Sequence, residues 1–312
     1  MRVDIAARLR FDARIMAIRL VVTDMDNTLY SWIDYVVPAV EAMVDAVVRS
    51  TSLPRLRVVQ SLKAVYTKYE SNEYPFALQE SSLFQEFPDF GSFDKLVIEP
   101  ARAAFSEARR KYLKPYKGVT ETLTALKERR IPVVALTDAP RNPAEQRVRR
   151  LGFDVLLTSL YTMPGFTFPA GPDGEALVAP DILQKQEKGA YKSACPLIEL
   201  PRDYEKPNPA GLKKILNTYG MRPEEVLVVG DSVKKDIAIA KELGCHDAWA
   251  EYGTYVPGEY RERLDIVSSN AITRRHVASV FEQGVQTVKP TRSLSNYAQV
   301  LDIIDALSTP KA

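Results

Sequence analysis

Short, continuous apolar runs are the feature that most constrains the fold of this chain. Four runs resemble buried strands, and they cover Arg19–Thr23, Pro132–Thr137, Val226–Gly230 and, less clearly, Asp247–Glu251. Strands of a parallel sheet are covered on both faces, so they are rich in Val, Ile and Leu throughout and do not alternate with polar residues. The runs therefore predict a parallel sheet with helices on both sides.

Helical patterns separate the predicted strands. They cover Val119–Arg130, Ala144–Leu151, Pro209–Tyr219 and Lys234–Leu243. Gly152, Gly220 and Gly244 follow three of these patterns, in positions where glycine commonly ends a helix. The alternation of strand and helix predicts an α/β fold, a doubly wound parallel sheet with right-handed crossovers.

Two stretches interrupt this alternation. Residues 31–114 lie between the first two predicted strands and carry apolar residues at helical spacing, so we expect an inserted α-helical domain. Residues 161–202 are rich in Gly and Pro, and we expect loop or small-sheet material there. The predicted core domain then consists of residues 16–30 and 115–312, and the 161–202 insertion lies within it.

Composition excludes several classes of function. The chain has 312 residues, 46% of them hydrophobic, and a net charge of only +2. So small a charge creates no global field that attracts nucleic acid or an anionic membrane surface. Every apolar run is far shorter than the roughly 20 residues that span a bilayer. We therefore expect no nucleic-acid or membrane partner, and a monomer or homodimer.

The N-terminus and the cysteines indicate the cellular setting. No apolar segment of the signal-peptide type follows the arginines of the first residues, so we expect no cleaved signal. Met16 begins the run into the first strand, and residues 1–15 are expected to form an extension outside the fold, or to precede the true start. Cys195 and Cys245 lie far apart without a zinc-binding pattern. A reduced, cytoplasmic setting is the resulting prediction.

The most informative local pattern directly follows the first predicted strand. It reads Thr-Asp-Met-Asp-Asn-Thr-Leu over residues 23–29. Ligands of open α/β sheets gather at the carboxyl ends of strands, which is where Asp24 and Asp26 lie. One carboxylate can act as nucleophile while the other carries a proton for the leaving group. Because an isolated Asp-x-Asp is more often a solvated acidic turn, this pattern needs support from other segments.

Three further polar segments supply that support. Thr137 and Asp138 end the second predicted strand, where a hydroxyl can donate to a phosphate oxygen. Lys206 precedes a predicted helix and offers a positive charge for an anion. Asp231 and Asp236 follow the third predicted strand and suit a hard cation. Each segment alone would also fit a helix cap or a surface loop, but together they predict one phosphate- and cation-binding site.

The four segments, in this order, resemble the four motifs of the haloacid dehalogenase superfamily. They span residues 24 to 236, which is most of the chain. The resemblance implies a Rossmann-like core, and it makes residues 31–114 similar to the α-helical cap domain of the first type. It also implies a phosphatase that hydrolyses a small phosphorylated metabolite, a phosphomonoester, through an aspartyl-phosphate intermediate.

The same resemblance assigns roles to single residues. Asp24 matches the nucleophile, and Asp26 matches the general acid that protonates the leaving oxygen and later activates water. Thr28, Thr137 and Lys206 match the residues that bind the phosphate.

A magnesium ion is implied as the cofactor. Its ligands by resemblance are Asp24, the backbone carbonyl of Asp26, and Asp231, with Asp236 at the ion or next to it. Charge supports this assignment, because these carboxylates and a phosphate dianion would repel one another without a cation.

Asp138 departs from the family pattern, and one basic cluster has two interpretations. Asp138 adds a carboxylate near the phosphate site, and we expect it to turn away and cap the helix that begins near Asn142, with substrate contact as the alternative. Arg109, Arg110 and Lys111 form a basic cluster near the end of the helical insertion. A solvated helix face is the favoured interpretation of this cluster, and a clamp for a substrate anion is the alternative.

Other functions remain compatible with these motifs to different degrees. A dehalogenase has no alkoxide leaving group to protonate, so Asp26 argues against it. A phosphomutase needs the same acid–base aspartate and magnesium. A binding or regulatory protein that kept the fold without turnover is the alternative from another class. The motifs do not identify the phosphomonoester.

Overall fold

The computed structural model of the chain describes residues 17–171, 174, 176–178, 192–256, 258–260, 263 and 288–308. The predicted extension over residues 1–15 lies outside the described residues, as does part of the Gly/Pro-rich stretch.

A six-stranded parallel sheet forms the centre of the fold, with the strand order β4-β3-β2-β1-β5-β6. The strands are β1 (Leu20–Thr23), β2 (Val133–Pro140), β3 (Ser159–Met163), β4 (Leu197–Glu199), β5 (Val226–Gly230) and β6 (His246–Trp249). Val22 of β1 lies opposite Val134 of β2 on one side and Val228 of β5 on the other. The predicted doubly wound α/β sheet is therefore confirmed, with the first strand near its middle.

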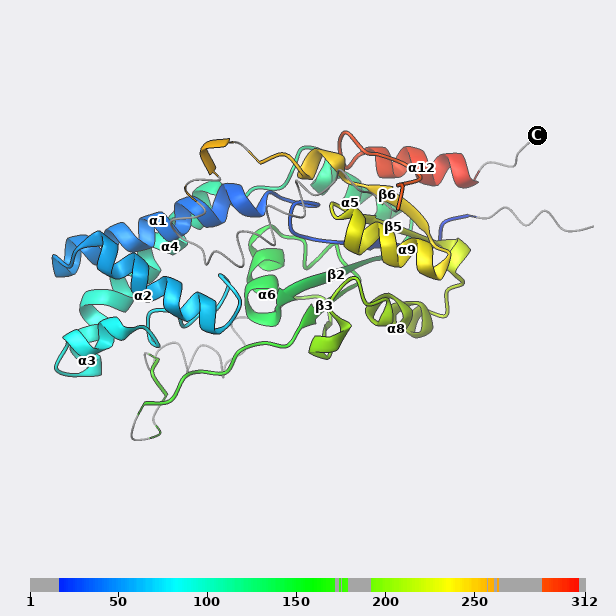
Figure 1. Cartoon of the computed structure of the whole chain (residues 1–312). Helices are drawn as coiled ribbons and strands as arrows, with labels where there is room; N and C mark the ends of the chain where they lie inside the picture. The colour runs from blue at the N-terminus through cyan, green and yellow to red at the C-terminus, as the bar shows by residue number, and fades with distance from the viewer. Residues whose placement is uncertain are drawn as a thin grey trace, which may run out of the picture.

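Helices cover both faces of this sheet (Figure 1). One face packs against α5 (Val119–Glu128), α6 (Arg141–Arg150) and α12 (Gln299–Ser308), and the other packs against α8 (Ala210–Tyr219) and α9 (Ala238–Leu243). Side chains of adjacent β1 residues point to opposite faces of the sheet. Val21 packs in the apolar cluster with α5, α6 and α12, whereas Leu20 and Val22 pack in the cluster with α8 and α9. Buried apolar residues on both sides explain why the strand sequences lack polar alternation.

Residues 31–114 are helical, as their spacing predicts. The helices are α1 (Trp32–Thr51), α2 (Arg55–Lys68), α3 (Phe90–Phe93) and α4 (Glu99–Tyr112). Ser31 caps α1 by accepting a hydrogen bond from Asp34 N at 3.2 Å. Helices α1 and α4 pack side by side, and their buried residues belong to the same apolar cluster as those of α5. The boundaries of a separate cap domain stay a prediction.

Short helical turns connect several of these elements. Four are 3₁₀ helices, η2 (Ser82–Glu86), η4 (Arg202–Tyr204), η5 (Pro223–Glu225) and η7 (Glu251–Gly253). Two are π-helical segments, η3 (Asp94–Ile98) and η6 (Val233–Ile237). Two residues separate segment η6 from β5, and η6 carries Asp236, so this turn presents a candidate site residue near the strand end.

Two strands were not predicted from the sequence. Strands β3 and β4 lie at the two ends of the Gly/Pro-rich stretch and extend the sheet beyond β2. The sequence of β3, Ser-Leu-Tyr-Thr-Met, is not a continuous aliphatic run, although all five residues are buried. Strand β4 has three residues at the sheet edge, which is too short for a periodic pattern.

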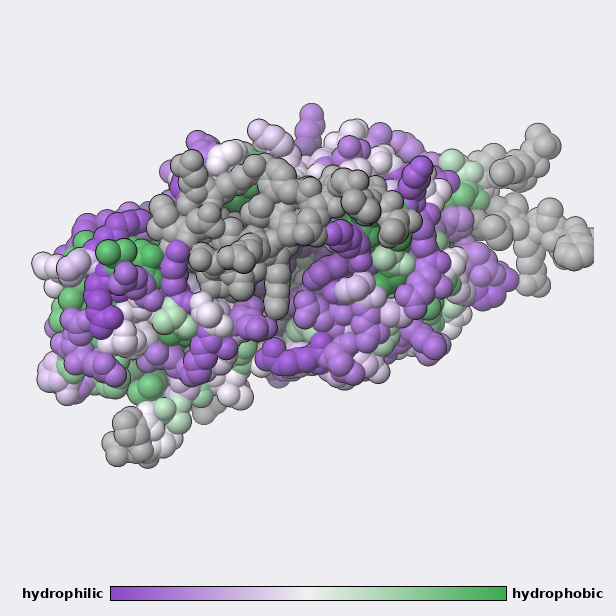
Figure 2. Space-filling view, in the orientation of Figure 1, coloured by the Kyte–Doolittle hydropathy of each residue, from purple (hydrophilic) through white to green (hydrophobic). Residues whose placement is uncertain are grey.

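Most of the surface seen in Figure 2 is hydrophilic, and hydrophobic residues appear in small groups. Large hydrophobic side chains that are exposed in the described residues include Leu56, Leu96, Tyr112, Val155 and Tyr255. None of the helices in the described residues is both long enough and apolar enough to cross a bilayer.

Candidate active site

The loop after β1 places Asp24 at the carboxyl end of the central strand. Asp24 N donates to Val229 O of β5 at 2.8 Å, and Leu29 N donates to Met25 O at 2.8 Å. Asn27 adopts φ 58°, the left-handed region that Asn tolerates better than most residues. These contacts fold the loop tightly above the sheet, at the edge where ligands of such sheets bind.

The loop is also supported by η7, the short helical turn that follows β6. Tyr252 donates its hydroxyl to Thr28 O at 2.5 Å. A Cβ on Gly253 would lie 1.6 Å from Asn27 O, so only glycine permits this approach. Segment η7 thus fixes the backbone of the loop.

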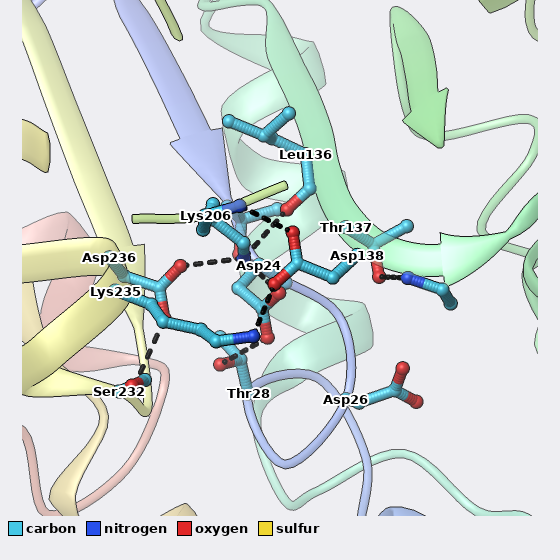
Figure 3. A network of polar contacts seen from close by, with 12 residues as sticks. Asp24, Asp26, Thr28, Leu136, Thr137, Asp138, Lys206, Ser232, Lys235 and Asp236 are labelled. Carbon is cyan, nitrogen blue, oxygen red and sulfur yellow. Dashed lines mark hydrogen bonds and ion pairs between the residues drawn. The ribbon is translucent and has the colours of Figure 1, made fainter. Parts of the chain in front are cut away.

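A buried lysine joins two of the predicted site aspartates (Figure 3). Lys206 Nζ lies 2.7 Å from Asp24 Oδ1 and 2.7 Å from Asp236 Oδ1. It also donates to Leu136 O at 3.2 Å, so each of its three protons has an acceptor. Lys206 is 5% exposed, and Asp24 and Asp236 are also buried. The ammonium group therefore fixes the orientation of Asp24.

Three carboxylates form a group that can hold a cation. One oxygen each from Asp24, Asp231 and Asp236 lie within 4.8 Å of one another. Asp236 Oδ2 also accepts a hydrogen bond from Ser232 N at 3.1 Å. Three carboxylates and the Lys206 ammonium leave two negative charges, which a divalent cation would neutralise. Oxygen ligands at this spacing fit Mg²⁺.

The pKa values of these groups reflect their burial and mutual repulsion. Burial raises the pKa of Asp24 to about 7, with Lys206 opposing and Asp236 and Asp26 adding to the rise. Burial, followed by the charges of Asp24 and Asp236, raises the pKa of Asp231 well above its usual range. Burial works against the charge of Lys206, but Asp236 and Asp24 raise its pKa well above the usual value. A bound cation would relieve this repulsion.

Asp26 points away from the lysine-centred group (Figure 3). Its Oδ1 accepts a hydrogen bond from the Tyr30 hydroxyl at 2.7 Å, and its Oδ2 accepts one from Arg147 Nη2 at 3.1 Å. Burial raises the pKa of Asp26 to about 6, although Arg147 and Tyr30 oppose the rise. The hydrogen-bonded network of Asp24 in the described residues does not include the Asp26 carboxylate.

Arg147 and Glu73 were missed by sequence reasoning. Arg147 lies on α6, is 1% exposed, donates to the Tyr35 hydroxyl at 2.9 Å and forms an ion pair with Glu73. Glu73, from the loop after α2, also accepts a hydrogen bond from Trp32 Nε1 at 2.9 Å. In the sequence, Arg147 is one of several arginines in a polar helix, and the only signal for its burial is its spacing of three residues from Ala144 and four from Leu151. Arg147 therefore links the loop after β1 to the helical insertion.

The two predicted phosphate-binding threonines lie at the ends of adjacent strands. Thr28 Oγ1 donates to Asp24 Oδ2 at 3.2 Å, and both residues are buried. Thr137 Oγ1 accepts a hydrogen bond from Ala139 N at 3.1 Å, which leaves the hydroxyl proton free for another partner.

Asp138 does not cap the helix after β2, so that expectation was wrong. Helix α6 begins after Pro140 without a side-chain cap. Asp138 Oδ1 accepts a hydrogen bond from Lys206 N at 3.0 Å, and Oδ2 accepts one from Lys235 Nζ at 2.8 Å. Two donors from other elements satisfy the carboxylate better than a local cap, and Asp138 thereby positions the backbone of Lys206.

Comparison with known proteins agrees with this geometry. The sequence pattern that describes haloacid dehalogenase-like hydrolases matches residues 18–244. The chain belongs to this family. The prediction of a hydrolase of the haloacid dehalogenase superfamily is thereby confirmed, and the matched region contains every predicted site residue.

Two relatives carry the name glyceraldehyde 3-phosphate phosphatase. The protein of Methanopyrus kandleri is 25% identical over 256 residues, 80% of this chain and 91% of the relative. The protein of Pyrococcus furiosus is 40% identical over 65 residues, which are 20% of this chain and only 27% of that protein.

A solved structure supports the fold assignment. The 2-haloacid dehalogenase of Pseudomonas syringae has a TM-score of 0.52 and 18% identity, with 93% of this chain and 99% of that chain covered. At this identity the likeness concerns the fold alone, and the catalytic reaction has to be argued from the site.

Proposed function

We propose that this family member is a magnesium-dependent phosphatase that hydrolyses a small phosphomonoester through a phosphorylated Asp24. The observation that carries the proposal is the contact of Asp24 with Lys206 beside Asp231 and Asp236. A carboxylate suited to act as a nucleophile, a fixed positive charge and carboxylates suited to a cation lie together at one edge of the sheet, and this combination supports the proposal. The relatives named phosphatases favour phosphorus over carbon as the atom attacked.

Asp24 would attack the substrate phosphorus in the first step. A bond forms between an Asp24 oxygen and phosphorus, the bond from phosphorus to the leaving oxygen breaks, and Asp26 gives its proton to that oxygen. Lys206 would stabilise the negative charge that Asp24 and the phosphoryl oxygens share. Magnesium, when bound, would neutralise phosphoryl charge and help to align the substrate.

Water would release the phosphate in the second step. Asp26, now ionised, accepts a proton from the water, the water oxygen bonds to phosphorus, and the bond to Asp24 breaks. A pKa of about 6 suits a group that gives and takes a proton near neutral pH. Because Asp26 is paired with Arg147 and Tyr30, this chemistry requires its side chain to turn toward the leaving group.

Other residues would hold the substrate. The hydroxyl groups of Thr28 and Thr137 would donate to phosphoryl oxygens, and the backbone carbonyl of Asp26 would complete the protein ligands of the cation. The helices of residues 31–114 would act as a cap that selects the substrate and limits access of water. Glyceraldehyde 3-phosphate, named for the relatives, is the first substrate to test.

The decisive experiment compares Asp24→Asn with the unmodified protein on a panel of phosphomonoesters that includes glyceraldehyde 3-phosphate. Asp24→Asn should lose nearly all phosphate release, since an amide does not attack phosphorus. Asp302→Asn, an exposed change on α12, is the matched control and should leave the rate unchanged. Mass spectrometry of the rapidly quenched unmodified protein should find phosphate on the peptide that contains Asp24. Substantial hydrolysis by a folded Asp24→Asn protein would contradict the mechanism.

A further inference from the structure

A large cavity lies between the helical insertion and the core. It has a volume of about 1370 Å³, and α1 and α4 line one side while α6 and residues 165–168 line the other. Part of its wall is aromatic, with ring centroids of Tyr74 and Phe166 4.9 Å apart and those of Tyr74 and Phe76 5.8 Å apart. A cavity of this size and lining suits a small ligand with an apolar part.

Positive side chains outnumber negative ones around this cavity, with seven cationic and five carboxylate residues in the wall. Three of the carboxylates are already paired. Glu73 pairs with Arg147, while Glu199 lies 2.7 Å and Glu145 3.7 Å from Arg141. The excess positive charge therefore comes from the other cationic residues of the wall, which are four arginines and Lys192.

Arg109 on α4 is the most informative of these arginines. Its Nη1 donates to Gln146 Oε1 at 2.7 Å, and its guanidinium lies 5.4 Å from the centre of the Phe105 ring. Its Nε is buried without a hydrogen-bond partner, and within the described residues no carboxylate lies within ion-pair distance. Burial, followed by repulsion from Arg150, lowers the pKa of Arg109 to about 10, with Tyr35 opposing the fall and Arg147 adding to it.

Neighbouring arginines extend this charge across the cavity. Arg150, at the exposed end of α6, repels Arg109, and it forms no ion pair with a carboxylate of the described chain. Arg147 lines the inner wall as well, but Asp26 and Glu73 already offset its charge, so the positive charge left for an anion in this part of the wall is that of Arg109 and Arg150. Cations are seldom kept together in partly buried positions unless an anion offsets them.

We propose that this cavity binds a small organic anion whose carboxylate or phosphate group pairs with Arg109 and Arg150, while its apolar part contacts the aromatic wall. The anion is either the non-reacting part of the substrate or a separate regulatory ligand. The identification of the anion as part of the substrate rests on the proposed phosphatase function, whereas binding of an anion in the cavity does not. Because Arg147 contacts both the cavity and Asp26, an anion in the cavity acts next to the proposed acid–base residue.

Binding is tested in the full-length Asp24→Asn protein, which removes turnover from the measurement. The probe is 3-phenylpropionate, titrated by calorimetry, with 3-phenylpropanol as its neutral analogue. The anion should bind and the alcohol should bind at least about tenfold more weakly, since a hydrogen bond to a charged group is worth roughly a factor of ten or more. Equal binding of acid and alcohol, or no binding of the acid, would overturn the proposal.

Substitutions at adjacent arginines locate the site. Arg109→Gln should weaken 3-phenylpropionate binding about tenfold or more, and Arg109→Lys should weaken it less because a charge remains. Arg110→Gln is the matched control, because Arg110 is exposed on the same helix and does not line the cavity. If Arg109→Gln does not fold, Arg150→Gln at the exposed end of α6 replaces it and should also weaken binding. Unchanged affinity in a folded variant of either kind would exclude the site.

Kinetic measurements on the unmodified protein then distinguish an anion that is part of the substrate from a separate regulatory ligand. Competitive inhibition of phosphomonoester hydrolysis by 3-phenylpropionate, lost in Arg109→Gln, supports the substrate source. A change in kcat at saturating substrate, again lost in Arg109→Gln, supports a regulatory ligand. If the protein hydrolyses no phosphomonoester, the proposed function fails while the calorimetric result still decides on the cavity.

Discussion

Arg147 and Asp26 are 121 residues apart in the sequence, yet Arg147 Nη2 lies 3.1 Å from Asp26 Oδ2. The same guanidinium pairs with Glu73 of the helical insertion. One buried cation therefore serves two carboxylates from different segments, and the position of the proposed acid–base residue depends on the insertion.

Replacement of this cation should be costly. Arg147→Gln would leave Asp26 and Glu73 without their ion-pair partner, and breaking a buried pair costs about 3–5 kcal/mol. We expect a loss of about 3 kcal/mol in the free energy of unfolding, at the low end because the Asp26 side chain is 24% exposed. Urea unfolding measures the loss.

Two further variants test the cause of that loss. Arg149→Gln, on the same helix, should change stability by no more than about 0.5 kcal/mol. Adding Glu73→Gln to Arg147→Gln should recover part of the loss, since one unpaired carboxylate is removed. A double variant as unstable as the sum of both single changes would contradict the ion-pair explanation.

The lysine between Asp24 and Asp236 should be needed for both activity and metal-free stability. Lys206→Met keeps most of the side-chain length, removes the ammonium group and leaves the two buried carboxylates to repel each other. We expect a fall in kcat of about a hundredfold or more, and a lower Tm without metal. Magnesium should reverse part of this fall in Tm, because it neutralises the same carboxylates. Equal Tm values for variant and unmodified protein without metal would show that Lys206 does not offset this repulsion.

Magnesium should raise the Tm of the unmodified protein and be required for turnover. Asp231→Asn removes one carboxylate of the proposed cation site, so it should abolish the magnesium-dependent rise in Tm as well as activity. Calcium should bind but support little turnover, because its larger and more flexible shell misaligns the reacting oxygens. Full activity after thorough chelation would rule out the proposed cofactor.

Both cysteines should be unreactive in the folded protein. Burial raises the pKa of Cys245 to about 12, and burial also raises the pKa of Cys195. The thiolate is the reactive form, so at pH 8 a thiol reagent such as dithionitrobenzoate should modify neither residue at an appreciable rate. Both should react at once in urea. Fast modification of the native protein would show that the packing around these thiols opens readily.

The sequence predicts the parts of this fold that can be recognised from a short stretch of residues. Strands β1 and β5 and the first half of β2 are aliphatic runs, and the polar residues that follow these runs lie together because parallel strands end at one edge. Lys206 was predicted to join this site because it precedes a helix of the α/β alternation, and it lies at the same edge of the sheet. Strands β3 and β4 were missed because burial of β3 depends on its neighbours, and β4 is too short for a pattern.

The sequence could not identify hydrogen-bond and ion-pair partners that come together only through tertiary packing. The spacing of Asp138 from α6 suggested a helix cap, but Lys235 and the backbone of Lys206 compete successfully for its oxygens. Helical spacing from Ala144, Val148 and Leu151 places Arg147 on the apolar side of α6 and Arg149 outside it, but an arginine on that side is not by itself expected to be buried. The partners of Asp138 and Arg147 come from distant segments, and neither periodicity nor motif spacing identifies such partners.

The support of Asn27 and Thr28 by Tyr252 and Gly253 bears on the order in which the protein is made. The ribosome synthesises Asp24 early, but the residues that hold its loop and neutralise its charge are added about 180 to 230 residues later. At roughly 5–20 residues per second, the nascent chain carries an unsupported acidic loop for about ten seconds or more. A ribosome-bound chain that ends shortly after Leu243 should therefore contain most of the sheet and yet lack a finished catalytic loop.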